Sequence, residues 1–99
     1  MKLHIISRTA THTVLPEVAR FVKGGCLLLI EDAVLCARSC SRSHDILRKL
    51  MDEGVEVYAL CEDLEARGIP QEKLCGGIKM VDNDGFVQLV EKYEVVPWL

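Results

Sequence analysis

Short apolar segments alternate with amphipathic segments along the whole chain, and this alternation constrains the fold more than any other feature. Segments typical of strands lie at residues 3–6, 26–30, 55–60 and 78–81, with an apolar tail at 95–99. Helical spacing of apolar residues fills most of the intervals, and the connections are short. Such alternation is typical of a parallel sheet covered by helices on both faces. We therefore predict a single domain over residues 1–99 with an α/β fold, built as three α/β/α layers around a small, mostly parallel sheet of four to five strands.

The first helix illustrates how the sequence marks its elements. Leu15, Val18 and Val22 fall on one side of a helix, as expected for a buried stripe. Pro16 is expected in the first turn, where a proline costs no hydrogen bond. Gly24 is expected just after the helix ends.

Composition excludes several classes of protein. Hydrophobic residues make up 49% of the 99 residues, which excludes a disordered chain. The net charge of −3 argues against direct, sequence-independent binding of nucleic acid, which needs a basic surface. No apolar run approaches the roughly 18–20 residues of a membrane span. The mean hydropathy of +0.18 indicates that a partner covers some apolar surface.

Five cysteines raise the question of compartment and of thiol chemistry. Their number is odd, their spacing does not repeat, and the first residues lack the apolar core of a signal peptide, so we expect a cytoplasmic protein with reduced thiols. Cys26 begins a buried strand and Cys36 lies in a predicted helix, so both are interpreted as core residues. Cys75 precedes two glycines in a predicted turn and is expected to be exposed.

Cys40 is the first candidate for a reactive thiol. Arg38 and Arg42 lie two residues to either side of it, and positive charge beside a thiol stabilises the thiolate. Cys61 is the second candidate because it stands between a predicted strand and a helix, where peptide dipoles favour a thiolate. Glu62 beside it acts in the opposite direction.

A metal site is the alternative interpretation of this region. Cys36, Cys40 and His44 are spaced by four residues, and one continuous helix would bring them to one face. Three ligands are too few for structural zinc, and the serine-rich stretch between them favours a loop. We therefore expect no metal and no cofactor here.

Acidic residues follow three of the predicted strands. They are Glu31 and Asp32, then Glu62 and Asp63, and finally Asp82 and Asp84. The carboxyl ends of parallel strands lie at one edge of a sheet, so these side chains could together hold Mg²⁺ and a phosphate. Each pair also precedes a predicted helix, and capping of these helices is the simpler interpretation.

Three segments together resemble one known family. They are LLLIEDAV at 27–34, VYALCEDLEARG at 57–68 and VDNDGFVQLV at 81–90, joined by Leu3-His4 near the start and Trp98 near the end. The chain resembles the TusB/DsrH family of sulfur-relay subunits over nearly its whole length. The middle segment is the most specific of the three.

The resemblance implies a fold of the DsrEFH type and a cytoplasmic role. TusB-like proteins assemble with TusC-like and TusD-like (DsrF-like and DsrE-like) subunits into a heterohexamer that passes persulfide sulfur towards 2-thiouridine at the wobble position of tRNA. DsrH-like proteins serve a related complex in sulfur-oxidising bacteria. The main sulfur-carrying cysteine belongs to the TusD-like partner, so the resemblance implies a carrier or non-catalytic subunit rather than an enzyme in its own right. Where such partners are absent, a homo-oligomer is the alternative.

This sequence departs from the family at the first helix. Some DsrH-like members carry a cysteine there, and Glu17 stands near that position. A carboxylate cannot carry persulfide, so any sulfur chemistry in this chain needs another thiol. Asn83 stands where an aromatic residue is usual. Three hypotheses follow: a supporting subunit of a sulfurtransferase complex, a self-contained persulfide carrier using Cys40, and an acidic domain that binds phosphate and magnesium.

Overall fold

The computed structural model describes the backbone of residues 1–7 and 11–98 and the side chains of residues 1–7 and 15–98. The elements follow one another as β1 (Lys2–Ile6), α1 (Thr11–Phe21), β2 (Cys26–Leu29), the 3₁₀ helix η1 (Glu31–Ala37), α2 (His44–Asp52), β3 (Glu56–Leu60), α3 (Cys61–Ala66), the 3₁₀ helix η2 (Gln71–Lys73), β4 (Lys79–Val81), α4 (Asn83–Lys92) and β5 (Glu94–Trp98).

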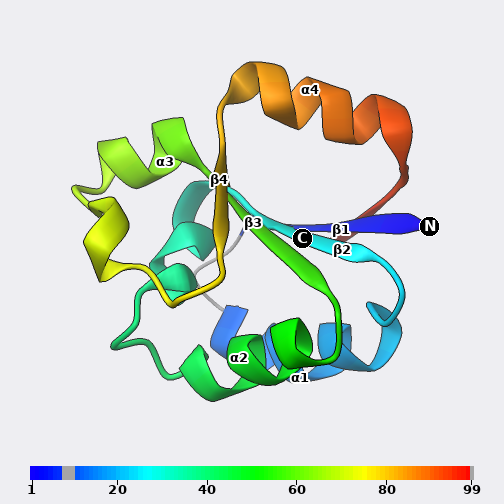
Figure 1. Cartoon of the computed structure of the whole chain (residues 1–99), viewed down its shortest axis with the longest axis horizontal. Helices are drawn as coiled ribbons and strands as arrows, with labels where there is room; N and C mark the ends of the chain where they lie inside the picture. Colours follow the sequence, from blue (N-terminus) through cyan, green and yellow to red (C-terminus); the bar gives the residue numbers. More distant parts are fainter. Residues whose placement is uncertain (8–10, 99) are drawn as a thin grey trace.

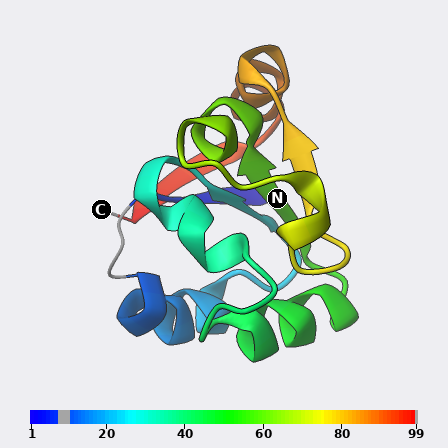
Figure 2. The same ribbon diagram turned by 90° about the vertical axis from the view of Figure 1, so that its left-hand side faces the viewer.

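The strands form one sheet whose order, among the described residues, is β4-β3-β2-β1-β5. All four pairings are parallel, so the sheet is wholly rather than mostly parallel in this part of the chain. Helices α1 and α2 lie on one face of the sheet and α4 lies on the other, as Figures 1 and 2 both show. The predicted three-layer α/β/α architecture is confirmed.

The larger core lies between the sheet and the α1–α2 layer. Leu15 and Val18 of α1 and Val22 just after it are completely buried there, together with Leu27 and Leu29 of β2. Burying one such side chain contributes about 1.5–3 kcal/mol. The start of α1 differs from the sequence prediction. Helix α1 begins at Thr11, so the proline expected in the first turn stands inside the helix. The helical hydrogen bond that a proline cannot donate costs less free energy than the buried apolar side chains of this segment contribute together.

The core on the other face of the sheet is smaller. Only Leu3, Cys26 and Leu28 are buried in it, and the side chains that surround them, Phe86 and Leu89 among others, are half-buried. None of the residues of α4, Asn83–Lys92, is buried. One helix of this length does not close the face of a five-stranded sheet.

The last strand, β5, forms one edge of the described sheet. Strand β5 pairs with β1, so the last described residues lie beside the first ones. Trp98 reinforces this pairing because its Nε1 donates a hydrogen bond of 2.9 Å to Nδ1 of His4. His4 is only 3% exposed. Burial, aided by the charge of Lys2, lowers the pKa of His4, so it accepts this bond as a neutral imidazole.

Candidate functional site

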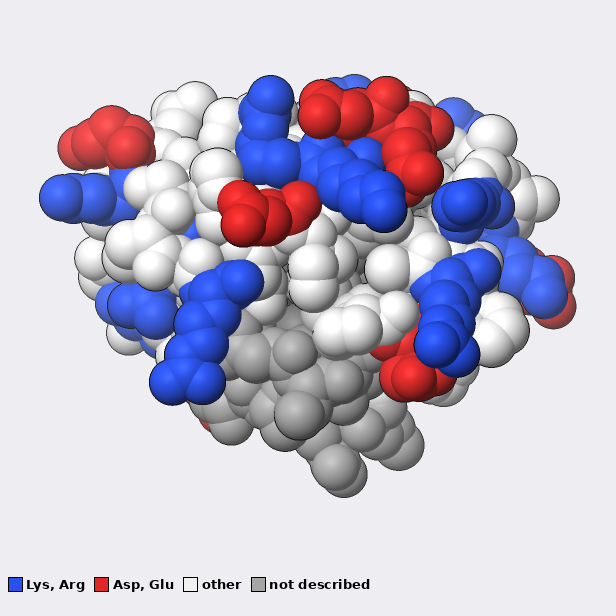
Figure 3. Space-filling model, turned by 90° about the horizontal axis from the view of Figure 1, so that it is seen from below, with Lys and Arg blue, Asp and Glu red and all other residues white. Residues whose placement is uncertain are grey.

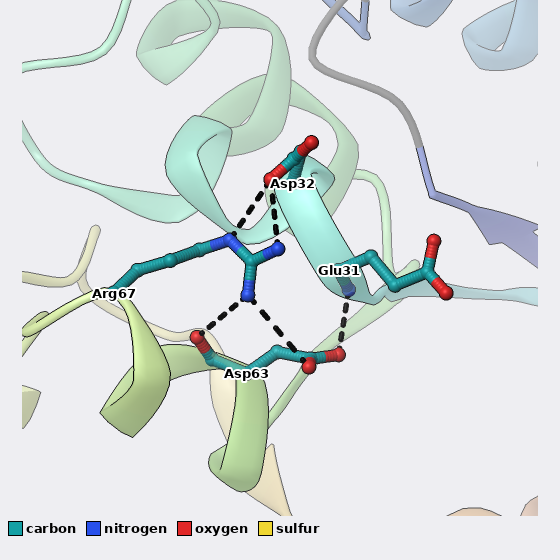
Figure 4. Close-up of polar contacts among 4 residues, drawn as sticks. All are labelled: Glu31, Asp32, Asp63 and Arg67. Atoms are coloured by element: carbon teal, nitrogen blue, oxygen red, sulfur yellow. Dashed lines mark hydrogen bonds and ion pairs between the residues drawn. The ribbon is translucent and has the colours of Figure 1, made fainter.

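The carboxyl edge of the sheet carries a network of charged side chains. Helix η1 follows β2 and α3 follows β3, which places Asp32 and Arg67 side by side although 35 residues separate them. Nε and Nη2 of Arg67 donate to Oδ1 of Asp32 at 3.1 and 2.7 Å. Nη1 of Arg67 donates to the carbonyl oxygen of Asp63 at 3.3 Å and lies 3.8 Å from its carboxylate. Figure 4 shows the guanidinium between the two aspartates.

The same aspartate also fixes the backbone at the end of β2. Oδ2 of Asp63 accepts a bond of 2.6 Å from the backbone N–H of Glu31, the first residue of η1 (Figure 4). Glu31 has a φ of +51°, which is unfavourable for a residue with a Cβ atom. Because a carboxylate bonds strongly to an N–H group, Asp63 helps to hold this sharp turn. Helix η1 thus receives its first hydrogen bond from a neighbouring element.

The acidic residues at this edge serve as caps and ion-pair partners. Asp82 caps α4, because its Oδ1 accepts a bond of 2.8 Å from the N–H of Gly85. Glu62 of α3 accepts a bond of 3.3 Å from the N–H of Asn83. No three or more His, Cys, Asp or Glu side chains lie together as metal ligands in the described part of the chain. The capping interpretation therefore holds for Asp82 at α4, whereas the N-cap residues of η1 and α3 make no side-chain hydrogen bond. The bonds that Asp63 and Glu62 of α3 accept tie η1, α3 and α4 together.

Cys40 lies on a loop that is held by backbone hydrogen bonds to a distant segment. The N–H of Ser39 donates to the carbonyl oxygen of Lys73 at 2.8 Å, and the N–H of Cys75 donates to that of Ala37, also at 2.8 Å. An isolated antiparallel bridge joins the same two segments between these bonds. The Cys40 thiol is free and exposed. The sequence therefore predicted its exposure correctly, but not the anchor of its loop.

A cavity of about 370 Å³ opens beside this thiol. Arg38, Arg67 and Lys73 line it together with Cys40, and its described lining contains no acidic residue. Apolar side chains complete the wall, namely Leu35, Ile69 and Pro70. The cavity thus combines a thiol, positive charge and an apolar surface, which is the composition of a small-molecule site.

The two arginines predicted to flank Cys40 have different positions. Arg38 lines the cavity, and its Nε donates to the carbonyl oxygen of Leu35 at 2.9 Å. Arg42 is exposed and is not among the described residues that line the cavity. Arg67 and Lys73 were not predicted there. Both are far from Cys40 in the sequence, and only the return of the chain after α3 brings them to it.

The remaining cysteines are less suited to react. Cys61 is half-buried, and burial together with the charges of Glu62 and Asp82 raises the pKa of its thiol. Cys26 is buried as predicted. Cys75 is also buried, so its predicted exposure is wrong. The two glycines after it form the turn, and the bond from its N–H to η1 draws Cys75 inward.

The spacing of Cys36, Cys40 and His44 does not produce a shared helical face. Helix η1 ends at Ala37 and α2 begins at His44, so a loop interrupts the proposed helix. Cys36 is buried in the core, whereas Cys40 is exposed.

A second and larger cavity, of about 450 Å³, lies between α1 and α2. Arg20, Lys23 and Lys49 line it, but two of these cations face acidic partners, Glu17 at 3.7 Å and Glu53 at 3.9 Å. The described lining contains no thiol. Figure 3 views the molecule from the side of α1 and α2, and over the described residues of this face Lys and Arg (blue) are interspersed with Asp and Glu (red). The cavity at Cys40 is therefore the better candidate site, although it is the smaller one.

The sequence matches one family along most of its length. A family described as "DsrH like protein" matches residues 9–96. A protein called "Protein TusB" from Pectobacterium parmentieri is 34% identical over 98 residues, which cover 97% of this chain and 99% of the relative. A protein of the same name from Salmonella enteritidis is 36% identical over 92 residues, covering 92% and 93% of the two chains.

Solved structures resemble the fold as well. The ychN protein from E. coli superposes with a TM-score of 0.82 at 16% identity, covering 99% of both chains. A protein of unknown function from Methanobacterium thermoautotrophicum gives a TM-score of 0.71 at 16% identity, covering 98% and 96%. No helix among the described residues is long and apolar enough to cross a membrane. The family match and the curated relatives together show that this chain belongs to the DsrH-like family.

Proposed function

We propose that this protein is a supporting subunit of a cytoplasmic sulfur-relay complex, in which it assembles with TusC-like and TusD-like subunits. The complex would pass persulfide sulfur towards the wobble uridine of tRNA or towards a related acceptor in sulfur oxidation. The observation that carries the proposal is the similarity to proteins named TusB over nearly the whole chain. The persulfide itself would travel mainly on a partner's cysteine.

The surface of α4 supports a role in assembly. Val87 is 53% exposed and Val90 is 39% exposed on a helix that buries none of its side chains. Exposed apolar side chains that cluster on one element indicate a protein interface. Strands β4 and β5 are the edges of the sheet among the described residues and offer further pairing surface.

Co-purification from the native host tests the proposal. We expect TusC-like and TusD-like proteins to elute with the wild-type chain, and deletion of the gene to reduce tRNA thiolation. Val87→Glu should weaken the complex because it places a charge in the apolar contact, whereas Gln88→Glu next to it serves as a control. If the wild-type chain elutes alone and its deletion leaves tRNA thiolation unchanged, the proposal is wrong. A homo-oligomer without partners would also contradict it.

A second candidate function is that Cys40 itself carries persulfide. The exposed thiol beside a cavity with three cationic side chains favours it. In such a step the Cys40 thiolate attacks the outer sulfur of a donor persulfide. The S–S bond of the donor breaks, the donor leaves as a thiolate, and Cys40 becomes a persulfide without any external oxidant.

Mass spectrometry tests this carrier function. The chain is incubated with a cysteine desulfurase and cysteine, and we expect the roughly 32 Da that one added sulfur atom brings. Cys40→Ser should abolish the adduct and Cys61→Ser should retain it. An undiminished adduct in Cys40→Ser would exclude Cys40 from this role, and its loss only in Cys61→Ser would assign the role to Cys61.

A further inference from the structure

The cavity beside Cys40 has positive charge that is available to a ligand. Arg67 is engaged with Asp32 and Asp63, so its charge is largely balanced. Arg38 and Lys73 have no salt-bridge partner in the part of the chain that the structure describes. The two cations therefore leave the cavity attractive to an anion.

The cavity is also preformed. Arg38 and Lys73 belong to the two segments that backbone hydrogen bonds and the antiparallel bridge hold together. Arg67 forms a third side of the cavity and is fixed by its aspartates. Binding of a ligand therefore orders few protein side chains and costs little conformational entropy, which favours the binding of small molecules.

The size and lining of the cavity indicate which ligand fits. A volume of about 370 Å³ lies within the usual range for small organic molecules and exceeds what a bare inorganic anion needs. Leu35 and Ile69 offer apolar contact to a carbon skeleton, and the cations offer charge-assisted hydrogen bonds to carboxylates.

We propose that this cavity binds a low-molecular-weight persulfide that carries carboxylate groups, of the size of a short peptide thiol. Arg38 and Lys73 bind its carboxylates, and its outer sulfur lies at Cys40. The inference rests on the carrier function proposed for Cys40 and adds a substrate class to it. In the transfer, the Cys40 thiolate bonds to the outer sulfur, the S–S bond of the donor breaks, and the small thiol leaves with the electron pair and takes up a proton.

Glutathione persulfide serves as the probe. The full chain is mixed with it at concentrations below saturation, and the rate of the single-sulfur adduct is followed by intact mass. Lys73→Gln should lower this rate roughly tenfold, the effect of losing one charge-assisted contact. Lys49→Gln, a change at another exposed lysine, is the matched control. Alkylation of Cys40 by neutral iodoacetamide is measured in both variants, and a loss of persulfide transfer that exceeds the loss of alkylation reports ligand binding rather than thiol reactivity.

Two results would overturn the inference. One is an equal rate for Lys73→Gln and Lys49→Gln, and the other is an undiminished adduct in Cys40→Ser. Transfer from a cysteine desulfurase distinguishes this failure from failure of the carrier function. If Cys40 accepts sulfur from the desulfurase but not from glutathione persulfide, only the small-molecule site is wrong. If it accepts sulfur from neither donor, the carrier function is wrong as well.

Discussion

Replacing Arg67 by glutamine should destabilise the protein more than its position near the surface suggests. Arg67 donates two hydrogen bonds to the carboxylate of Asp32 and one to the backbone of Asp63. Its side chain is 25% exposed and that of Asp63 is 23% exposed, but Asp32 is 54% exposed, so solvent screens part of the network. Bonds to charged groups contribute about 1.5–3 kcal/mol when buried and exposed pairs contribute about 0.2–1 kcal/mol. We therefore expect a loss of about 1–2 kcal/mol.

Urea denaturation followed by circular dichroism measures this loss as a lower midpoint with an unchanged m-value. The melting temperature should fall by roughly 5–15 °C for a domain of this length. Arg20→Gln is the matched control because its pair with Glu17 is exposed on both sides, and we expect less than about 0.5 kcal/mol there. A double-mutant cycle with Asp32→Asn should give a coupling energy of about 1 kcal/mol.

The reasoning fails if Arg67→Gln and Arg20→Gln are equally stable. It also fails if Asp32→Asn and Arg67→Gln are strictly additive, because then the network that joins η1 to α3 contributes nothing to stability.

Three further predictions concern the backbone, the C-terminal strand and the thiols. Gly25→Ala should lower the unfolding free energy measured in urea, because an added Cβ would lie 2.5 Å from a carbonyl oxygen of β1; wild-type stability would contradict this. His4 has a lowered pKa in the folded state, so the unfolded chain binds its proton more readily and stability falls as the pH drops below about 6.5. His4→Asn, which can still accept the bond from Trp98, should lose less stability between pH 7.5 and 5.5, and equal losses would exclude His4 as the cause. Under native conditions iodoacetamide should label Cys40 before Cys61, as read by peptide mass mapping; the reverse order would contradict the exposures and the raised pKa of the Cys61 thiol.

The order of the helices and strands could be predicted from the sequence because the spacing of apolar residues over a few positions determines where each element forms. The alternation of apolar and amphipathic segments predicted the parallel three-layer fold, and Asp82 marked the start of α4 by a short-range bond. Exposure of Cys40 followed from its polar neighbours. These features depend on residues only a few positions apart.

The errors fell where distant contacts outweigh local preference. Pro16 suggested a later helix start, but α1 begins at Thr11 and tolerates the proline because Leu15 and Val18 near it are completely buried. Cys75 stood next to turn residues, yet its N–H bonds to η1 and its side chain is buried. In both cases tertiary packing supplied free energy that the local sequence does not display.

What the amino-acid sequence determined by itself is the family, the fold and a short list of thiols. What only the tertiary structure decided is the environment of those thiols. Arg67 and Lys73 reach the cavity at Cys40 because the parallel sheet aligns the ends of β2 and β3 and the chain after α3 returns to η1. The physical reason is that the interaction between charges depends on their distance in space. Residues about thirty positions apart in the sequence come close together only when the sheet has formed.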